Sequence, residues 1–294
     1  MHRRTFLQGV SAVSLASVLA RPLHAIPAAS AYLKNIGLQL WTVRNQMEDS
    51  VPQTLKAVAE AGYKQVELMD VEKGADIAKT ARDLGMDVTS SFFDWQVICK
   101  PGLFVSSQDK VVEAAKDMGL KHLVFGYIGK GSRETKAQYQ RWAERANALG
   151  EKCQTAGIQL CYHHHSFEFG KLAGSNETGF DILVREFDTK LAKFEIDVFW
   201  VAIGGRDPLK VLQQLDGRVS QVHLKDLLAG TPVIHDESKV PNDAFQEVGQ
   251  GTIDFSAILE TAKQIGVQQC HVEQDQSPDP IASIGTSLAY LTKG

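Results

Sequence analysis

The stretch QTAGIQLCYHHH, residues 154–165, contains the kind of junction that decides the fold. A helical pattern ends at Gly157, and an apolar, strand-like run begins at the next residue. Glycine just after a helix adopts the left-handed backbone conformation without a Cβ penalty, so it marks the end of a helix. The same helix–glycine–strand junction recurs along the chain, at Gly62, Gly85, Gly119, Gly217 and Gly266.

Strand-like runs alternate with helical patterns throughout the chain after residue 25. Strands that are separated by helices pair in parallel. Eight such units in 269 residues (294 − 25) predict a (β/α)8 TIM barrel, which is an α/β fold. A doubly wound open sheet is the alternative, but no G-x-G-x-x-G follows the first strand. The expected strands are 36–41, 65–69, 87–93, 122–127, 158–164, 193–198, 219–225 and 268–274.

The N-terminus has the three parts of an export signal. Arg3 and Arg4 precede an apolar run over 10–20, and Ala25 closes a cleavage site. We therefore expect a twin-arginine signal peptide over 1–25, a single TIM-barrel domain over 26–294 and a periplasmic or exported location. The run is too short and too rich in Ser and Ala to span a bilayer well. No later segment is long and apolar enough to cross one, so we expect no membrane association after cleavage.

Charge and cysteine content narrow the classes of partner. The formal net charge is −4, with basic and acidic residues interspersed, so the sequence offers no basic stripe for nucleic acid. The four cysteines form no CxxC pair, and a disulfide framework is not expected in a chain of this length. A homo-oligomer is compatible with the sequence, which does not specify an oligomeric state.

A TIM barrel carries its active site at the C-terminal ends of its strands, so polar residues at those ends are the candidates for chemistry. Residues two apart in a strand share a face, which places His163 with His165 and His223 with Lys225. The strand-end candidates, in chain order, are Gln39, Trp41, Glu67, His163, His165, Glu168, Asp197, His223, Lys225 and Glu273.

Three carboxylates and one imidazole come from four consecutive strand ends: Glu168, Asp197, His223 and Glu273. This donor set suits one divalent cation, with Mn²⁺ expected first and Mg²⁺, Co²⁺ or Zn²⁺ also compatible. Burying three carboxylates together without a cation would be very costly. Such a site with open coordination positions can polarise the carbonyl group of a sugar.

The histidine triplet leaves alternatives open. His164 faces a helix and is expected to be structural, whereas His163 and His165 face the barrel and can transfer protons or bind substrate hydroxyls. In the alternative, His165 is the strand-five ligand and Glu168 lies behind it. Lys225 either stabilises a developing oxyanion or forms a salt bridge with one of the carboxylates.

Six motifs resemble the sugar phosphate isomerase/epimerase family, a group of xylose isomerase-like TIM barrels. The resemblance extends over residues 34–293 and rests on IGLQLWTVR, YHHHSFEF, FEIDVFWV, VHLKDL, EVGQGTIDF and HVEQD. It implies a divalent metal held by Glu, Asp, His and Glu from strands five to eight. The Tyr-His-x-His pattern also resembles enzymes that cleave 3-keto-glycosides by β-elimination.

The resemblance implies a metal-dependent isomerase or epimerase that removes a proton α to a metal-polarised carbonyl of an unphosphorylated sugar or glycoside. A 3-keto-glycoside lyase on the same site and a non-catalytic sugar-binding protein are the alternatives. A metal nuclease of the endonuclease IV type shares the barrel but needs a basic groove. The expected catalytic residues are Glu168, Glu273, His163, His165 and Lys225, and the expected substrate-binding residues are Gln39, Trp41, Glu67 and Trp200.

Overall fold

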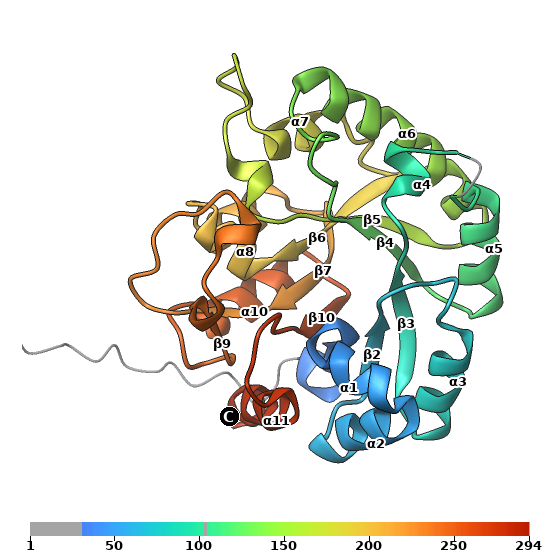
Figure 1. The fold of residues 1–294 in the computed structure, drawn as a ribbon, viewed down its shortest axis with the longest axis vertical. Helices are drawn as coiled ribbons and strands as arrows, with labels where there is room; N and C mark the ends of the chain where they lie inside the picture. The colour runs from blue at the N-terminus through green and yellow to red at the C-terminus, as the bar shows by residue number, and fades with distance from the viewer. Residues whose placement is uncertain (1–30, 103–104, 294) are drawn as a thin grey trace, which may run out of the picture.

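The computed structural model describes residues 31–102 and 105–293. The expected signal peptide, residues 1–25, lies outside the described residues. Eight parallel strands close into a barrel in the order β1-β10-β7-β6-β5-β4-β3-β2, with helices around the outside (Figure 1). The predicted (β/α)8 fold is therefore confirmed. The barrel strands are β1 (Gly37–Gln39), β2 (Gln65–Leu68), β3 (Asp87–Phe92), β4 (His122–Gly126), β5 (Gln159–His163), β6 (Ala192–Asp197), β7 (Val219–Leu224) and β10 (Gln269–Val272).

Helices follow the strands and pack their apolar residues against the outside of the barrel. The α-helices are α1 (Arg44–Asp49), α2 (Val51–Ala61), α3 (Ala75–Asp83), α4 (Gln96–Cys99), α5 (Gln108–Asp117), α6 (Lys136–Thr155), α7 (Gly179–Glu186), α8 (Val198–Ile203), α9 (Pro208–Gln214), α10 (Phe255–Gln264) and α11 (Pro280–Thr292). Short 3₁₀ helices are η1 (Ala31–Lys34), η2 (Leu40–Val43), η3 (Phe167–Phe169), η4 (Glu237–Lys239) and η5 (Asn242–Ala244).

The six junction glycines adopt the expected conformation. Each has a φ between 68° and 109°, in the left-handed region, where a Cβ would be strained. They lie one to three residues after the last residue of their helices and lead directly toward the next strand. The repeated glycine is therefore a local signal that the chain uses to turn back into the barrel.

The first strand ends earlier than expected. We predicted a strand over 36–41, but β1 ends at Gln39 and η2 begins at Leu40. The side chain of Gln39 accepts a hydrogen bond from the Trp41 backbone N–H at 3.0 Å and so caps the 3₁₀ turn. This early turn carries Trp41 to the rim of the barrel, where its residue surface is 45% exposed.

The loop after β7 is held to the barrel by one buried carboxylate. Asp226 begins β8 (Asp226–Leu227), which pairs antiparallel with β9 (Phe245–Gln246). Its two oxygens accept backbone hydrogen bonds from Leu227, Gly249, Gly251 and Ile253 at 2.8–3.0 Å. Gly251 is required here, because a Cβ would lie 2.4 Å from Asp226 Oδ1. The segment after β7 is thus a two-stranded antiparallel pair joined by a long loop over 228–244, and part of that loop lines the cavity described below.

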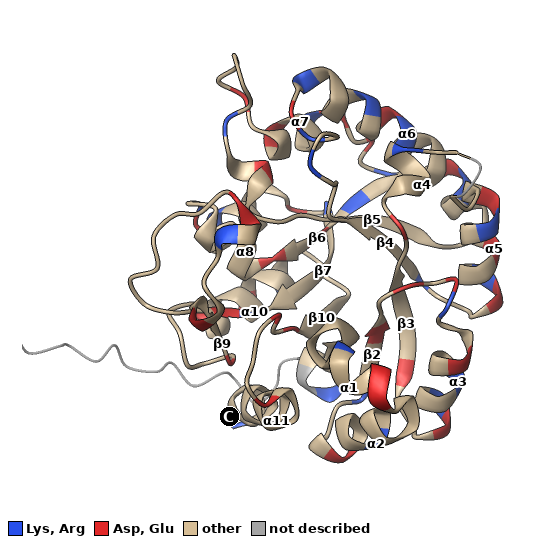
Figure 2. Ribbon diagram, in the orientation of Figure 1, with Lys and Arg blue, Asp and Glu red and all other residues tan. Residues whose placement is uncertain are grey.

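Basic and acidic residues alternate along the outer helices without forming a face of one sign in this view (Figure 2). Among the residues that the structure describes, no helix has both the length and the apolar character needed to span a bilayer.

We predict that Asp226→Ala lowers the free energy of unfolding by about 3 kcal/mol, because four buried N–H groups lose their acceptor. Chemical denaturation of the purified protein measures the change. Asp216→Ala, at an exposed position, is the control and should stay within about 0.5 kcal/mol of wild type. Equal stability of the two variants would show that Asp226 does not anchor the loop.

Candidate metal centre and active site

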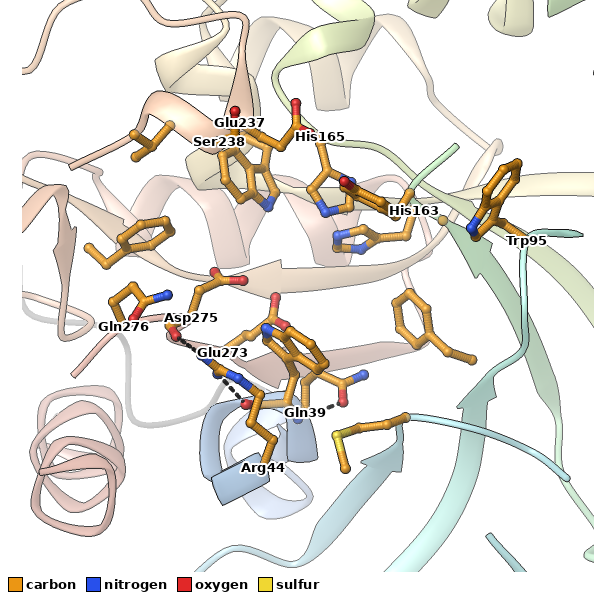
Figure 3. Close-up of a pocket in the computed structure, with 18 of the residues that line it drawn as sticks. Gln39, Arg44, Trp95, His163, His165, Glu237, Ser238, Glu273, Asp275 and Gln276 are labelled. Carbon is orange, nitrogen blue, oxygen red and sulfur yellow. Dashed lines mark hydrogen bonds between the residues drawn. The ribbon is translucent and has the colours of Figure 1, made fainter. Parts of the chain in front are cut away.

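A cavity of about 630 Å³ opens at the C-terminal end of the barrel. Its lining comes from the ends of several strands and from the loops that follow them (Figure 3). Six of the predicted site residues line it directly: Gln39, Trp41, His163, His165, Trp200 and Glu273.

Four side chains converge at this end of the barrel, and two of them, His163 and Glu273, line the cavity. His163 ends β5, Asp197 ends β6, His223 lies in β7, and Glu273 follows β10. One ligand atom from each lies within 4.8 Å of the others, and all four residues are buried. The structure thus brings together three of the four predicted metal ligands, with His163 as the fourth member in place of Glu168.

Two buried carboxylates below this group orient its imidazoles. Glu195 Oε1 lies 3.0 Å from His163 Nδ1 and 3.1 Å from His223 Nε2. Glu67 Oε2 lies 2.7 Å from His223 Nε2. These contacts turn His163 Nε2 and His223 Nδ1 toward the site, where His223 Nδ1 lies 3.0 Å from Glu273 Oε2. A carboxylate behind an imidazole is the usual device that fixes a metal-binding histidine.

Lys225 supplies positive charge from within the wall. Its side chain is fully buried, and its ammonium lies 2.7 Å from Glu273 Oε2 and 3.1 Å from Asp197 Oδ2, and it also contacts Asp275. Burial lowers the pKa of Lys225, but the three carboxylates, Asp197 foremost, raise it more, so the net shift is upward. Lys225 therefore stays protonated. Of the two roles expected for it, the structure shows the salt bridge with the carboxylates. Its ammonium is not part of the cavity surface.

The residues present fit a divalent cation. They offer two imidazole nitrogens and two carboxylates, a set that suits Zn²⁺, Mn²⁺ or Co²⁺. Within the described part of the chain, buried Asp197 Oδ2 accepts no hydrogen bond, although it is paired with Lys225. Asp197 Oδ2 and the oriented imidazoles are therefore the atoms that a bound metal would coordinate.

A second group of potential ligands lies deeper, formed by Glu67, Glu195, His223 and His271. Apart from His271 Nδ1, its ligand atoms have hydrogen-bond partners among the described residues, and none of its members lines the cavity. Besides the histidines, the partners are the Ser90 hydroxyl for Glu67, the Gln221 amide for Glu195 and the Gln65 amide for His271. We therefore interpret this group as the support for His223 and not as a second metal site.

Glu168 does not lie where the sequence placed it. Its oxygens contact the Tyr162 hydroxyl and accept a hydrogen bond from the His165 backbone N–H at 2.9 Å. Tyr162 packs beside Phe125, outside the barrel interior, with ring centroids 4.8 Å apart. Because the chain turns into η3 after His165, Glu168 points back under the loop. We correct the candidate ligand set accordingly, with His163 replacing Glu168, and Glu168 has no contact with the reacting region.

The other predicted residues take distinct positions. His165 lines the cavity, and its Nδ1 is buried without a hydrogen-bond partner in the described chain. His164 faces away and accepts a hydrogen bond from the Asp197 backbone N–H at 3.3 Å, a structural role as expected. Gln39 and Trp200 reach the cavity, but Glu67 does not line it and instead supports His223 from below.

Sequence reasoning missed two carboxylates that share the faces of predicted residues. Glu195 lies two residues before Asp197 in β6, and Asp275 lies two residues after Glu273. Period-two alternation along a strand would have assigned both to the interior. Asp275 lines the cavity and contacts Lys225, and burial raises its pKa to about 6.

The family of Xylose isomerase-like TIM barrels matches residues 55–293. Inosose dehydratase of Clostridium botulinum is 26% identical over 278 residues, covering 84% of this chain and 88% of that protein. A sugar phosphate isomerase/epimerase from Parabacteroides distasonis superposes with a TM-score of 0.70 at 23% identity, covering 88% of this chain and 98% of that one. The IOLI protein with a bound zinc atom superposes with a TM-score of 0.62 at 14% identity, covering 88% of this chain and 98% of that one.

We predict that Glu168→Gln changes how stability depends on pH. Burial raises the pKa of Glu168 to about 8 from an ordinary 4.5. The folded protein therefore keeps a proton that the unfolded chain releases, and wild-type stability falls as pH rises between these values, by up to about 1.4 kcal/mol per pH unit. The glutamine variant lacks this loss, so its free energy of unfolding should rise relative to wild type from pH 5 to pH 8. A constant difference, as expected for the exposed control Glu151→Gln, would contradict the buried carboxyl.

We predict that Lys225→Met lowers the stability of the metal-free protein by about 3–5 kcal/mol, because three carboxylates lose their buried partner. Mn²⁺ or Zn²⁺ should then raise the unfolding temperature of the variant more than that of wild type, because the ion no longer competes with the ammonium. Thermal unfolding with and without each metal measures both effects. Lys56→Met, at an exposed helix position, is the control. A smaller metal response in Lys225→Met would contradict this competition.

Proposed function

We propose that this chain, which belongs to the xylose isomerase-like TIM barrel family, is an enzyme that removes the proton next to a carbonyl group in a neutral carbohydrate. The observation that carries the proposal is the convergence of His163, Asp197, His223 and Glu273, of which His163 and Glu273 line the cavity. The relatives and neighbours reported above are sugar-modifying enzymes by name, which supports the same class of substrate.

A divalent metal held by these four residues would polarise the substrate carbonyl and bind the adjacent hydroxyl. The zinc atom bound by the IOLI neighbour supports a divalent metal in this chain as well. Mn²⁺ remains our first expectation, and Zn²⁺, Co²⁺ and Mg²⁺ remain alternatives.

Glu273 is the proposed base. Its Oε2 is held by His223 and Lys225, whereas Oε1 has no hydrogen bond among the described residues and the side chain lines the cavity. Oε1 is therefore the atom that accepts the α-proton. Lys225 adds positive charge behind the carboxylates and so favours the negative charge that develops on the substrate oxygen.

Elimination is the outcome that the geometry supports best. Epimerisation needs acid–base groups on both faces of the substrate, and Glu168, the expected second carboxylate, is bound to Tyr162 instead. Elimination needs one base and a proton donor for the leaving group. The α C–H electrons form the double bond, the β C–O bond breaks, and the leaving oxygen takes up the proton that Glu273 has removed from the α-carbon. The inosose dehydratase relative supports this direction.

Isomerisation or epimerisation is the second candidate, because it begins with the same proton removal and the Parabacteroides distasonis neighbour is described as an isomerase/epimerase. His165 would then be the second acid–base group. Figure 3 shows His163 and His165 on one side of the pocket and Glu273 and Asp275 on the other. A non-catalytic sugar-binding protein fits the cavity as well but leaves the four convergent ligands without a role.

The cavity favours an unphosphorylated substrate. Arg44 lines it, but its terminal nitrogens donate hydrogen bonds to the backbone carbonyls of Trp41 and Asp275 at 2.7 and 2.8 Å. Three carboxylates, those of Glu237, Glu273 and Asp275, also line the cavity. A phosphate would meet these carboxylates, while the Arg44 donors are already bound to backbone carbonyls. A neutral carbohydrate also agrees with the export that the N-terminal sequence predicts.

The test uses NMR in D₂O on neutral keto sugars and keto cyclitols, with Mn²⁺, Co²⁺ or Zn²⁺ added. We expect exchange of the α-proton followed by loss of the β-substituent, and a fall in turnover of at least about 10²-fold in Glu273→Gln because the base is lost. Elemental analysis of the variant separates loss of the base from loss of metal.

Glu260→Gln, on an exposed part of α10, is the control and should keep wild-type turnover. Proton exchange with an isomer as the product would favour the second candidate. Full turnover by Glu273→Gln would remove Glu273 from the mechanism, and sugar binding without exchange or turnover would leave the binding-protein alternative.

A further inference from the structure

Part of the cavity wall comes from a segment that the barrel holds only loosely. We call residues 229–243, in the loop between β8 and β9, the lid. Every residue of the lid is exposed or half-buried, so it is not part of the packed core. In Figure 3, Glu237 and Ser238 of the lid lie on the side of the pocket away from Glu273. Four lid residues line the cavity: Glu237, Ser238, Val240 and Asn242.

Both ends of the lid are fixed to the barrel. At its base, the Leu228 N–H donates a hydrogen bond to the Ala244 carbonyl at 3.0 Å, next to the β8–β9 pair. Asp226 binds the backbone of the returning chain at Gly249 and Gly251, which anchors the base from below. A displacement of the lid is therefore confined to the residues between two anchored ends, as in a hinged loop.

Few contacts hold the middle of the lid. Apart from the hydrogen bonds at its base, one backbone–backbone hydrogen bond joins it to the rest of the described chain, from the Ile234 N–H to the Ile203 carbonyl at 3.0 Å. Ile234 and Val240 are partly buried and pack against a small apolar cluster that includes Trp200 of the cavity wall. Few buried apolar contacts and few backbone hydrogen bonds mean low local stability, the property of segments that open as lids.

Two ion pairs hold the lid against the loop after β4. Arg133 pairs with Glu237 at 2.7 Å, and the two side chains are only 7% and 9% exposed; we call this pair the latch. Lys130 forms a more exposed pair with Asp236 at 3.1 Å and donates a hydrogen bond to the Ser238 hydroxyl at 3.1 Å. Because β5 and β6 lie between β4 and β7 in the barrel, the latch joins loops that are not neighbours.

The side of the latch that faces the lid is itself fixed. The Ser132 carbonyl accepts a hydrogen bond from Trp142 Nε1 at 2.6 Å, which ties the loop after β4 to α6. The Arg133 guanidinium lies over the Phe167 ring at 3.4 Å from its centroid. When the latch breaks, we therefore expect Arg133 to stay in place and the lid to move.

The latch is a finely balanced contact. Burying a guanidinium and a carboxylate costs hydration, which their attraction repays only when the remaining donors and acceptors are also satisfied. In the described chain, Arg133 Nη1 and Glu237 Oε2 are buried without a hydrogen-bond partner. Both groups regain water when the lid opens, which offsets the loss of their attraction. The closed and open arrangements are therefore close in free energy.

We propose that residues 229–243 open and close over the cavity, and that the Arg133–Glu237 latch sets the balance between the two states. Opening takes the lid residues out of the cavity wall and widens the mouth for a ligand to enter. Closing returns their side chains to the wall and encloses the ligand. This inference does not depend on the reaction proposed at Glu273.

Two changes to the latch should move the lid in opposite directions. Glu237→Gln leaves the Arg133 charge buried without its partner, which favours the open state because water then reaches the guanidinium. Arg133→Met combined with Glu237→Leu replaces the pair with apolar side chains of similar size, which favours the closed state. Lys136→Gln is the matched control, because it breaks an ion pair with Glu177 at the start of α6 and leaves the lid untouched.

Double electron–electron resonance measures the position of the lid. Spin labels are placed on Lys239→Cys in the lid and on Glu151→Cys in the last turns of α6, both exposed positions. All four native cysteines are buried, so the introduced thiols take the labels. We expect one main distance and a minor second one in wild type, a majority of the second in Glu237→Gln, and the main distance alone in the apolar double variant. Lys136→Gln should keep the wild-type distribution.

Amide exchange at Ile234 is a second readout that needs no label, because this N–H is bonded to Ile203 in the closed lid. Exchange should be at least about ten-fold faster in Glu237→Gln than in wild type, and slower than wild type in the apolar double variant. Amides of β5 and β6 should stay within about two-fold of wild type in both, which separates lid opening from a general loss of stability.

Two results would overturn the inference. One distance shared by wild type and all variants, with unchanged exchange at Ile234, would show that the segment is a fixed wall. A majority of the second distance in both Glu237→Gln and the apolar double variant would show that the ion pair is required for packing and is not a latch. Neither result bears on the proposed function, which is tested by proton exchange and turnover.

Discussion

The structure depends on a balance of charges inside a barrel whose outer packing is apolar. Glu67, Glu195, Asp197 and Glu273 are buried together with His223 and Lys225. A buried carboxylate is tolerated only when hydrogen bonds or opposite charge offset its loss of water. The eight-stranded frame holds these groups within contact distance of one another, and their mutual contacts then restrict each ring and carboxylate to one orientation. The same interactions therefore support the fold and define the site.

The repetitive part of the fold was readable from sequence, because it depends on local signals. Each junction glycine is required by a backbone angle, and each strand is a short apolar run. The predicted end of a strand was wrong by a few residues where a local side-chain contact competed with strand pairing. At β1, the Gln39 side chain caps η2 and so ends the strand early. Three of the candidate ligands were also readable, because Asp197, His223 and Glu273 lie at strand ends whose direction the barrel fixes.

The remaining parts of the site depend on contacts that no local pattern carries. Glu168 follows the strand by five residues, and its direction is set by the turn at η3 and by Tyr162, a residue of the outer face. His163 became the better candidate only when the end of β5 was located. The ion pair between Arg133 and Glu237 joins residues 104 positions apart in sequence, and neither loop has a motif. Such long-range contacts are therefore the part of the site that is least predictable from sequence.

The charges around Lys225 connect the proposed metal with the proposed neutral substrate. Asp197, Glu273 and Asp275 surround one ammonium, which leaves an excess of two negative charges if all three are ionised. A divalent cation offsets that excess, and a phosphate on the substrate would restore it. Burial raises the pKa of Asp275 to about 6, so its carboxyl is the one of the three that takes up a proton most readily. A neutral ligand is the one that leaves the metal-loaded balance unchanged.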